Sequence, residues 1–594
     1  MSRNEAPATT NYTLSSGSHL EPSPTIGSAL RRLAPLMADE KRTVALAFLA
    51  IIISSATSLL APVIIGRAID VNIRNRDFVG LLGLSALLLV VYVIGLFATY
   101  FQTQRMGSVG RRVLFKLRNA LFTKLQQLPL DFFNRNKSGD LISRINNDTD
   151  KLNQFFAQSL VQLASNVFLM TGAAILLLTL NLRLGIAALV PALGVLIITR
   201  VTSNWVKQRN LQGLQSLGGV SAEVQESLSN FKVIVAFNRL DYFRQKFDEA
   251  NQRNFAASVK AGIASNIFVP IFGLAFNLAQ LLALAYGAYL IAAGQLTMGL
   301  LISVLLYVNS FYFPLRQLAA VWASFQLALA GLDRISAVLK LESNMSRVDG
   351  EPGRPGPVLE FENVHFSYPG GQEVLKGGTF TLERGKTYAL VGPTGGGKTT
   401  TASLMARLYD PTDGRVLLDG KDIRSYEPEG RSRKVGFILQ DPFLFTGTIR
   451  DNILYGNEAF QSYANEHIVG LLTARNLDRL LARFGQGLET PVASVGDGIS
   501  LGQKQLIAFM RAVIRDPEIL ILDEATANID TVTEQLLEEI LAKLPPSTTK
   551  VIIAHRLNTI ANADEIFFIN SGDITPAGSM QHALDMLLHG KRES

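Results

Sequence analysis

The residues with the clearest chemistry form a glycine-rich loop at 392–400, Gly-Pro-Thr-Gly-Gly-Gly-Lys-Thr-Thr. Residues 387–391 before it are an apolar run suited to a buried strand, and residues 400–409 after it have helical spacing. A glycine loop between a strand and a helix lets backbone N–H groups converge on phosphate oxygens. The pattern predicts that Lys398 pairs with the β- and γ-phosphates of a nucleotide and that the Thr399 hydroxyl ligates Mg²⁺. The residues expected around the phosphates are Thr394, Gly395, Gly396, Gly397, Lys398, Thr399 and Thr400.

The alternative interpretation of this loop is an ordinary glycine turn in an α/β domain, and a second motif argues against it. Residues 518–524 form an apolar run that ends in two carboxylates, Asp523 and Glu524. At the carboxyl end of a strand beside a phosphate loop, Asp523 is expected to help hold Mg²⁺, directly or through water. Glu524 would orient and deprotonate the attacking water. Taken alone, the run also fits a strand followed by a solvated acidic turn.

Composition shows what kind of chain carries these motifs. The 594 residues exceed one domain, and 48% of them are hydrophobic, so part of the chain is expected to be insoluble in water. The net charge of +7 suits either nucleic acid or the cytoplasmic loops of a membrane protein. The absence of cysteine excludes disulfides and thiolate metal sites.

The distribution of apolar and charged residues indicates a membrane protein. Six apolar segments are each long enough to cross a bilayer, at about 43–67, 79–104, 156–180, 183–204, 262–293 and 296–327. The polar stretches after the second and fourth segments are rich in Lys and Arg, which marks the cytoplasmic side. Both termini and the phosphate loop are therefore expected in the cytoplasm, and a soluble ATPase acting on nucleic acid is disfavoured.

The same pass along the chain predicts its domains. Residues 1–27 are polar and are expected to be a disordered tail. The transmembrane domain is predicted at 28–327, a linker at 328–357 and a soluble α/β domain at 358–594. Polar side chains inside the spans fit either a substrate path or interhelical packing, and packing is the favoured interpretation. They are Asn166, Asn266, Asn277, Gln280, Asn309 and Gln317.

Jointly, these motifs resemble an ABC transporter over residues 28–590. Residues 358–594 resemble its nucleotide-binding domain, and the six-span region resembles the exporter-type half-transporters of the multidrug and lipid families. The resemblance implies a six-helix, all-α transmembrane domain followed by an α/β P-loop domain, with ATP and Mg²⁺ as cofactors. Residues 130–148 and 227–247 resemble the two cytoplasmic loops that couple the domains in this family.

Further site residues follow from the resemblance, motif by motif. Tyr368 matches the aromatic residue that stacks on adenine, and Gln440 matches the glutamine that contacts Mg²⁺ and the attacking water. His555 matches the switch histidine at the γ-phosphate. Residues 499–503 occupy the place of the signature motif that binds the opposite subunit's ATP. From that motif and the following D-loop we expect Ser500, Gly502, Gln503 and Asp530 to take part.

Two positions depart from the family pattern. Leu501 stands where the signature normally has glycine, and Ser494 stands where a glutamate is usual. The branched Leu501 side chain is expected to crowd the phosphate or the facing P-loop. With the P-loop, Asp523, Glu524 and His555 intact, this asymmetry resembles the catalytic chain of bacterial heterodimeric exporters. It favours a heterodimer, and a homodimer stays open.

The function implied is ATP-driven export of hydrophobic or amphipathic drugs or lipids across the bacterial inner membrane. A lipid floppase, a peptide or siderophore exporter and an ATP-gated channel are the alternatives on the same scaffold. The expected partners are a second half-transporter, membrane lipids and a small hydrophobic substrate, without nucleic acid.

Overall fold

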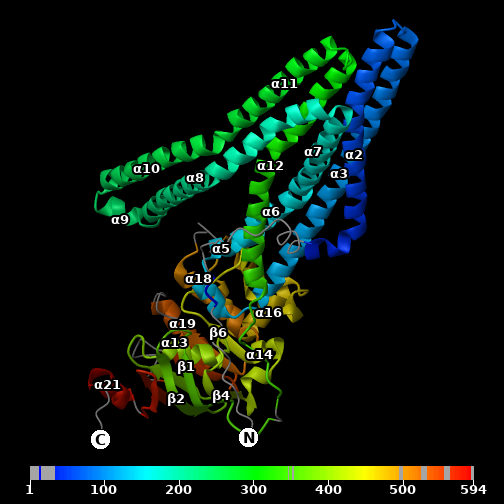
Figure 1. The fold of residues 1–594 in the computed structure, drawn as a ribbon. Helices are drawn as coiled ribbons and strands as arrows, with labels where there is room; N and C mark the ends of the chain where they lie inside the picture. Colours follow the sequence, from blue (N-terminus) through cyan, green and yellow to red (C-terminus); the bar gives the residue numbers. More distant parts are fainter. Residues whose placement is uncertain are drawn as a thin grey trace, which may run out of the picture. The chain divides into compact units, whose positions relative to one another are not determined.

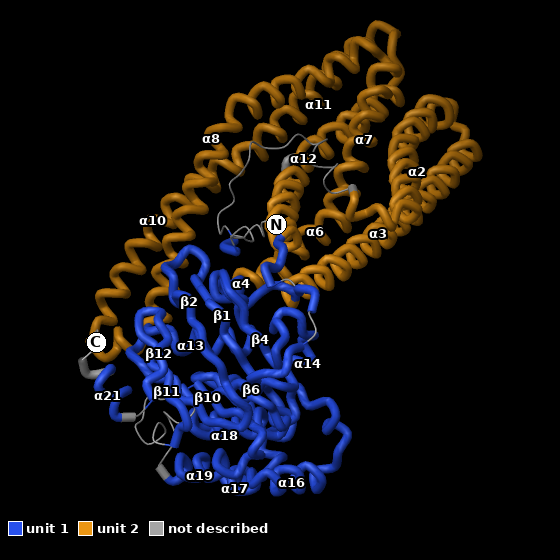
Figure 2. The backbone as a smooth tube through the Cα atoms, turned by 90° about the horizontal axis from the view of Figure 1, so that it is seen from below, with its two compact units in different colours: residues 1–14, 127–137, 341–594 blue, residues 15–126, 138–340 orange. Residues whose placement is uncertain are grey.

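The computed structural model describes residues 12–14, 34–345, 347–350, 353–493, 499–523, 531–553, 562–578 and 580–589. The chain divides into two compact units, coloured separately in Figure 2. Unit 1 takes its described residues from 1–14, 127–137 and 341–594, and unit 2 from 15–126 and 138–340. The chain therefore passes from one unit to the other four times. Part of the first predicted cytoplasmic loop, 127–137, belongs to the unit that carries the phosphate loop.

Unit 2 is helical over its described residues (Figure 1). Its elements are η1 (Ala34–Glu40), α2 (Lys41–Arg67), η2 (Ala68–Ile73), α3 (Phe78–Gln127), α5 (Ser138–Ser143), η3 (Arg144–Asp148), α6 (Thr149–Gln154), η4 (Phe155–Ser159), α7 (Leu160–Leu180), α8 (Leu182–Ser229), α9 (Phe231–Ala236), α10 (Leu240–Asn266), α11 (Phe268–Ala292) and α12 (Met298–Leu339). Of these, η2, η3 and η4 are π-helical.

Six helical stretches of the described chain are long and apolar enough to cross a membrane, which confirms the six predicted spans. They are Pro35–Ile73, Phe78–Gln127, Ser138–Leu180, Leu182–Ser229, Leu240–Ala292 and Met298–Leu339. Most are much longer than a span requires. Helix α3 has 50 residues, which corresponds to about 75 Å at 1.5 Å per residue, whereas about 20 residues cross the hydrocarbon layer. Much of the predicted cytoplasmic stretches is therefore a continuation of the membrane helices.

Close backbone approach and hydrogen bonds fix the packing of α12 in unit 2. A Cβ atom on Gly299 would lie 2.1 Å from the Gly66 carbonyl oxygen, so α12 and α2 can approach this closely only with glycine there. The Ser303 hydroxyl donates to the Pro62 carbonyl at 2.8 Å. The Asn166 amide donates to the Gln317 side chain at 3.3 Å, joining α7 to α12. This bond agrees with the packing role favoured for polar residues in the spans.

The described residues of unit 1 form two larger sheets and the two-stranded sheet β7-β8. The four-stranded sheet has the order β2-β1-β4-β5, and the six-stranded sheet has the order β12-β11-β3-β10-β9-β6. In the second sheet β11, β3, β10, β9 and β6 are parallel, and β12 is antiparallel at the edge. The strands are β1 (Leu359–Ser367), β2 (Glu373–Leu382), β3 (Thr387–Val391), β4 (Asp413–Leu418), β5 (Lys421–Asp422), β6 (Val435–Ile438), β7 (Gly447–Thr448), β8 (Pro491–Val492), β9 (Ile519–Asp523), β10 (Thr549–Ile553), β11 (Glu565–Asn570) and β12 (Asp573–Pro576).

Helices flank these sheets and close the two larger of the three hydrophobic cores found among the described residues of unit 1. One core joins the four-stranded sheet and α13 to β3, β9 and β10, and the other joins α15 to α19 with β6 and β9. The helices are α4 (Leu130–Arg135), α13 (Lys398–Met405), η5 (Ile423–Ser425), α14 (Pro428–Lys434), α15 (Ile449–Ile453), η6 (Glu458–Phe460), α16 (Asn465–Ala474), α17 (Asp478–Leu481), η7 (Gly487–Glu489), α18 (Leu501–Val513), α19 (Thr531–Ala542) and α21 (Met580–His589). Parallel strands place their carboxyl ends at one edge of the sheet, and the predicted motifs follow those ends.

Candidate nucleotide-binding site

The glycine-rich loop connects β3 to α13 and lies tightly on β11. Gly392, Gly395 and Gly397 have φ angles of +147°, +81° and +114°, which side-chain-bearing residues rarely adopt. A Cβ atom on Gly392 would lie 2.0 Å from the carbonyl oxygen of Ile569. The glycines are therefore required by the backbone path of the loop and by its contact with the neighbouring strand.

Lys398 begins α13 and folds back over the loop. Its side chain is buried, and its Nζ donates to the carbonyl oxygens of Gly392 at 2.9 Å and of Pro393 at 3.0 Å. These bonds hold the ammonium group inside the curve of the loop, next to the N-terminus of α13. A cation and a helix N-terminus together favour a bound anion at this position.

The structure brings Thr399 and Asp523 together from positions far apart in the chain. Asp523 ends β9 and is buried, and its Oδ1 lies 3.5 Å from the Thr399 hydroxyl. Hydroxyl and carboxylate oxygens are ligands that Mg²⁺ accepts. Two neighbouring ligands of one octahedral Mg²⁺ lie about 3 Å apart, given metal–oxygen distances of about 2.1 Å. The pair therefore fits the ion, with a small inward movement of the two oxygens.

Tyr368, the residue predicted to stack on adenine, lies beside α13. Its hydroxyl is 3.0 Å from the hydroxyl of Thr400 in the first turn of that helix. Its ring meets Phe366 and Tyr409 edge to face, with centroids 4.9 and 5.3 Å apart. The three rings form an aromatic cluster, and Tyr368 is only half-buried in it. Stacking of this ring on adenine stays a prediction.

The remaining predicted catalytic residues follow strands that end side by side. Gln440 is exposed two residues after β6, and β6 pairs in parallel with β9, Ile438 opposite Leu522. β9 pairs in turn with β10, Asp523 opposite Ile553. Glu524 follows β9 and His555 follows β10 in the sequence, but both lie outside the described residues, as do Asp530 and Ser494.

The signature segment forms the N-terminus of α18. Ser500 and Gln503 cap each other: the Ser500 hydroxyl accepts from the Gln503 backbone N–H at 3.2 Å, and the Gln503 side chain accepts from the Ser500 N–H at 3.0 Å. Leu501 is the first residue of the helix, Gly502 the second, and the Leu501 side chain is 41% exposed. Leucine is compatible with this helical position. Any effect of Leu501 on function is therefore expected on a phosphate or P-loop that binds at the helix end, rather than on the helix itself.

Two contacts of the site were not predicted from the sequence. The Asn134 amide on α4 donates to the Tyr409 hydroxyl at 2.8 Å, and the Arg135 guanidinium donates to the carbonyl of Pro369. Both acceptors adjoin Tyr368, one through its ring and one along the chain. The sequence resemblance named this loop as a coupling element, but nothing in its residue types indicated which residues it touches.

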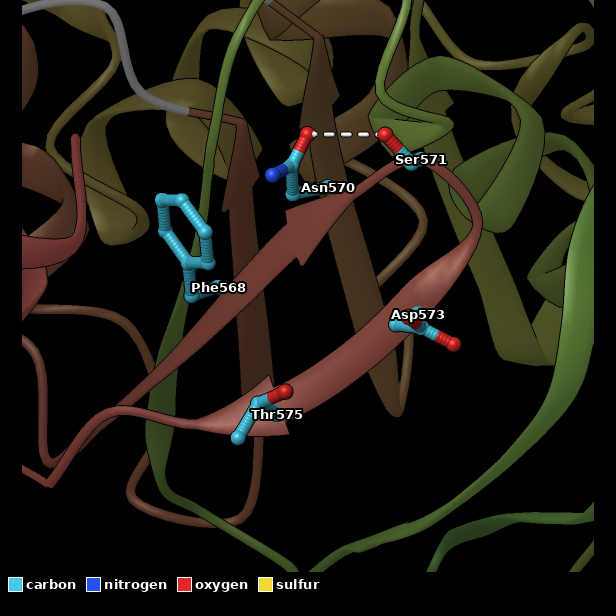
Figure 3. Close-up of a pocket in the computed structure, with 5 residues that line it drawn as sticks. All are labelled: Phe568, Asn570, Ser571, Asp573 and Thr575. Atoms are coloured by element: carbon cyan, nitrogen blue, oxygen red, sulfur yellow. Dashed lines mark hydrogen bonds between the residues drawn. The ribbon is translucent and has the colours of Figure 1, made fainter. Parts of the chain in front are cut away.

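The hairpin of β11 and β12 supports the glycine loop and carries a small cavity. The Gly572 N–H at its turn donates to the Gly396 carbonyl at 3.3 Å. Figure 3 shows the side chains that line the cavity, whose volume is about 220 Å³: Phe568, Asn570, Ser571, Asp573 and Thr575. It lies outside the predicted nucleotide contacts.

Comparison with known proteins agrees with this geometry. Residues 44–315 match the family model "ABC transporter transmembrane region", and residues 375–527 match the model "ABC transporter". The chain is 35% identical over 558 residues to the uncharacterized ABC transporter ATP-binding protein YfiC of Bacillus subtilis, covering 93% of this chain and 91% of that protein.

The chain belongs to the ABC transporter family. It is also 32% identical to a fatty acid ABC transporter ATP-binding/permease protein of Mycobacterium bovis, over 85% of this chain and 80% of that protein. The probable multidrug resistance ABC transporter YheH of Bacillus subtilis is 32% identical, over 84% and 74%. This ABC transporter has the exporter layout, couples ATP hydrolysis to transport, and is an integral membrane protein.

Proposed function

We propose that this ABC transporter exports hydrophobic or amphipathic compounds by alternating access, as one half of a dimer. The observation that carries the proposal is the Thr399–Asp523 pair beside the glycine loop, in a chain that also has six spanning helices. The relatives named for multidrug resistance and for fatty acids support drugs or lipids as the substrate class. Peptides and siderophores are the alternative substrates.

In this proposal the residues that follow the parallel strands have separate roles in ATP hydrolysis. The backbone N–H groups of 394–400 and Lys398 hold the phosphates, and Thr399 and Asp523 hold Mg²⁺, with Gln440 near it. When bound there, the ion would supply positive charge that offsets the negative charge of the phosphates. Glu524 accepts a proton from the attacking water, and His555 contacts the γ-phosphate.

The signature end of α18 serves the ATP held by the other half. Ser500, Gly502 and Gln503, together with Asp530, would contact that nucleotide, so each ATP touches both nucleotide domains. Binding then closes the two domains, and hydrolysis permits reopening. Leu501 is exposed at this helix end, and its branched side chain would crowd a phosphate or a facing P-loop that binds there. It supports a heterodimer in which the hydrolytic site combines this chain's P-loop with the partner's signature.

Exposed apolar side chains on unit 2 support the proposal that the chain binds a partner chain. Helices α8 and α10 run side by side with α9 between them in sequence (Figure 1). Large apolar side chains are exposed on α9 and the residue after it: Phe231, Val233, Val235 and Phe237, at 49–75%. An exposed apolar patch of this kind usually marks an interaction site.

A second apolar patch lies in unit 1, close in sequence to Gln440. Leu439, Phe443, Phe445 and Tyr455 are 38–64% exposed, and the Phe445 and Tyr455 rings stack at 4.1 Å. The Arg511 guanidinium, whose pKa is lowered by burial, lies 5.8 and 5.5 Å from these two rings. We propose that α9 of one half docks on this patch, termed the aromatic patch, of the other half.

Because the chain has no cysteine, crosslinking can test the docking and identify the partner. Oxidation of a mixture of Val235→Cys and Phe443→Cys chains should give a disulfide-linked pair if the protein is a homodimer. In a heterodimer, Val235→Cys should instead link to a cysteine at the matching patch of the other half-transporter. Val532→Cys, exposed by 63% on α19, is the matched control and should not link to Val235→Cys. If neither pairing exceeds this control, α9 does not dock on the aromatic patch.

Replacement of Glu524 tests the hydrolytic assignment. Glu524→Gln keeps the size of the side chain but cannot accept a proton, so ATP binding should stay near that of the wild type while turnover collapses. The measurement is nucleotide binding and phosphate release by the full chain. Near-normal turnover in this variant would show that another residue acts as the base.

A further inference from the structure

Tyr12, in the predicted disordered tail, is a packed residue. Its side chain is fully buried. Its hydroxyl donates to the Glu342 carbonyl at 2.8 Å and accepts from the Asn344 N–H, also at 2.8 Å. Because the buried hydroxyl both donates and accepts a hydrogen bond, these bonds compensate for the loss of its hydrogen bonds to water. Tyr12 is thereby fixed to the first residues of the linker that follows α12.

The backbone around Tyr12 is bound on its other side by Asn136, the C-cap residue that follows α4. The Asn136 Oδ1 accepts from the Leu14 N–H at 3.0 Å, and its Nδ2 donates to the Tyr12 carbonyl at 2.8 Å. The same Nδ2 donates to the Phe132 carbonyl in α4 at 2.7 Å. A single amide therefore joins the residues at 12–14 to the last turn of α4. An aspartate of the same shape would lack the donor.

Apolar contact completes the cluster. The Tyr12 and Phe132 rings meet edge to face, with centroids 6.5 Å apart at 85°, and Phe132 is fully buried. Three segments distant in sequence, 12–14, 132–136 and 342–344, thus form one polar and aromatic contact inside unit 1.

The position of this contact along the chain is informative. The chain leaves unit 1 after residue 14 and again after residue 137, and it returns at residue 341 (Figure 2). The three segments in the contact each lie within about six residues of one of these crossings. When one unit moves relative to the other, the backbone at these crossings has to accommodate the motion, because the chain is continuous there. Tyr12 therefore links three of the four covalent connections between the units.

We propose that residues 12–14 are a strap that fastens α4 to the start of the linker, so that the two move as one piece during the transport cycle. Helix α4 also holds Tyr409 and the Pro369 carbonyl next to Tyr368. Without the strap, α4 keeps those contacts but moves independently of the linker. Hydrolysis then continues while less of it drives transport. The last step rests on the proposed export function.

The first test asks whether the strap exists in solution. Thr13 is exposed between the two anchored residues, so Thr13→Cys gives the cysteine-free chain a single site for a spin label. The label should be motionally restricted in the otherwise native chain and freely mobile with Tyr12→Ala. Tyr12→Phe keeps the ring and should stay between them. Amide exchange at 130–137 and 342–344 should rise by about tenfold or more in Tyr12→Ala. A label that is already mobile in the native chain, or unchanged exchange, overturns the strap.

The second test asks whether the strap couples hydrolysis to transport. In liposomes, Tyr12→Ala should keep ATPase activity within about twofold of the wild type, while transport of a fluorescent amphiphile per ATP falls by about threefold or more. Tyr12→Phe should fall less. An unchanged ratio in Tyr12→Ala overturns the coupling role. If the wild type itself does not transport the amphiphile, the proposed substrate class fails, whereas the label and exchange data still decide the strap.

Discussion

The hydroxyls of Thr399 and Thr401 in α13 have different partners. The metal assignment can therefore be tested within one helix. The exposed Thr399 faces Asp523 across 3.5 Å. The buried Thr401 donates instead to the carbonyl of Gly397 at 2.9 Å, inside the helix. Thr→Val removes a hydroxyl at nearly constant shape. Thr399→Val should therefore impair Mg²⁺ use, and Thr401→Val should affect only stability.

The magnitudes follow from these contacts. The Gly397 carbonyl also accepts the Thr401 N–H at 2.9 Å, so losing the hydroxyl does not orphan it. Thr401→Val should then lower the free energy of unfolding by about 1 kcal/mol, or about 2–4 °C for a unit of this size. Thr399→Val breaks only a long, exposed contact and should cost less than about 0.5 kcal/mol. Loss of a metal-binding hydroxyl should weaken apparent Mg²⁺ affinity by at least about 10–100-fold, the range known for supporting residues.

The assay is ATPase activity of the full chain, with its partner if one is required, titrated with Mg²⁺ at saturating ATP. Thermal unfolding is measured on the same samples. Thr399→Ser, which keeps the hydroxyl, should retain Mg²⁺ dependence close to that of the wild type. Wild-type Mg²⁺ dependence in Thr399→Val, or an equal shift in Thr401→Val, would refute the reasoning that places the ion at Thr399 and Asp523.

Three further outcomes can be checked on unit 1. Ser500→Ala and Thr448→Ala each remove the hydroxyl of a capping box and should each lower the free energy of unfolding by about 1 kcal/mol. Only Ser500→Ala should weaken ATP-dependent association of the two halves. Equal association defects in both variants would make the Ser500 effect structural. Gly392→Ala should abolish nucleotide binding, measured with a fluorescent ATP analogue, because its Cβ would lie 2.0 Å from the Ile569 carbonyl oxygen; binding near that of the wild type contradicts the loop geometry. Hydrogen bonds from the backbone and hydroxyl of Thr448 lower the pKa of Asp451. The Asp451 carboxylate therefore contributes its full stability above its unfolded pKa of about 3.9, and this contribution is lost as pH falls through the pKa of the folded state. Asp451→Asn should lose less stability than the wild type in that acid range, and an unchanged pH profile of unfolding contradicts this.

The fold could largely be predicted because its signals are local in sequence. Twenty-residue apolar segments are recognisable without tertiary information, and all six predicted spans are present. The strand at Thr387–Val391 was predicted with its observed bounds, because a short apolar run bordered by a glycine loop has few alternatives. The helix after the loop ends at Met405 rather than near Tyr409, and Tyr409 instead joins the aromatic cluster with Tyr368.

The contacts that could not be predicted join segments far apart in the chain. Tyr12 lies in a polar stretch whose composition is typical of disorder, and its burial depends on Asn136 and on the linker backbone. The contact of Asn134 with Tyr409 likewise depends on the path of the chain between units. Single-sequence patterns contain the residue types for such contacts but not their pairing.

The most direct test of the central claim is ATP-driven transport by the purified chain in liposomes, measured alone and with a second half-transporter. ATP- and Mg²⁺-dependent accumulation of a fluorescent amphiphile should occur, and Glu524→Gln should abolish it. Transport by the single chain would identify a homodimer that tolerates Leu501, and transport only after addition of the second half would identify a heterodimer. ATP hydrolysis without accumulation of any amphiphilic probe in either preparation would contradict the proposed export function.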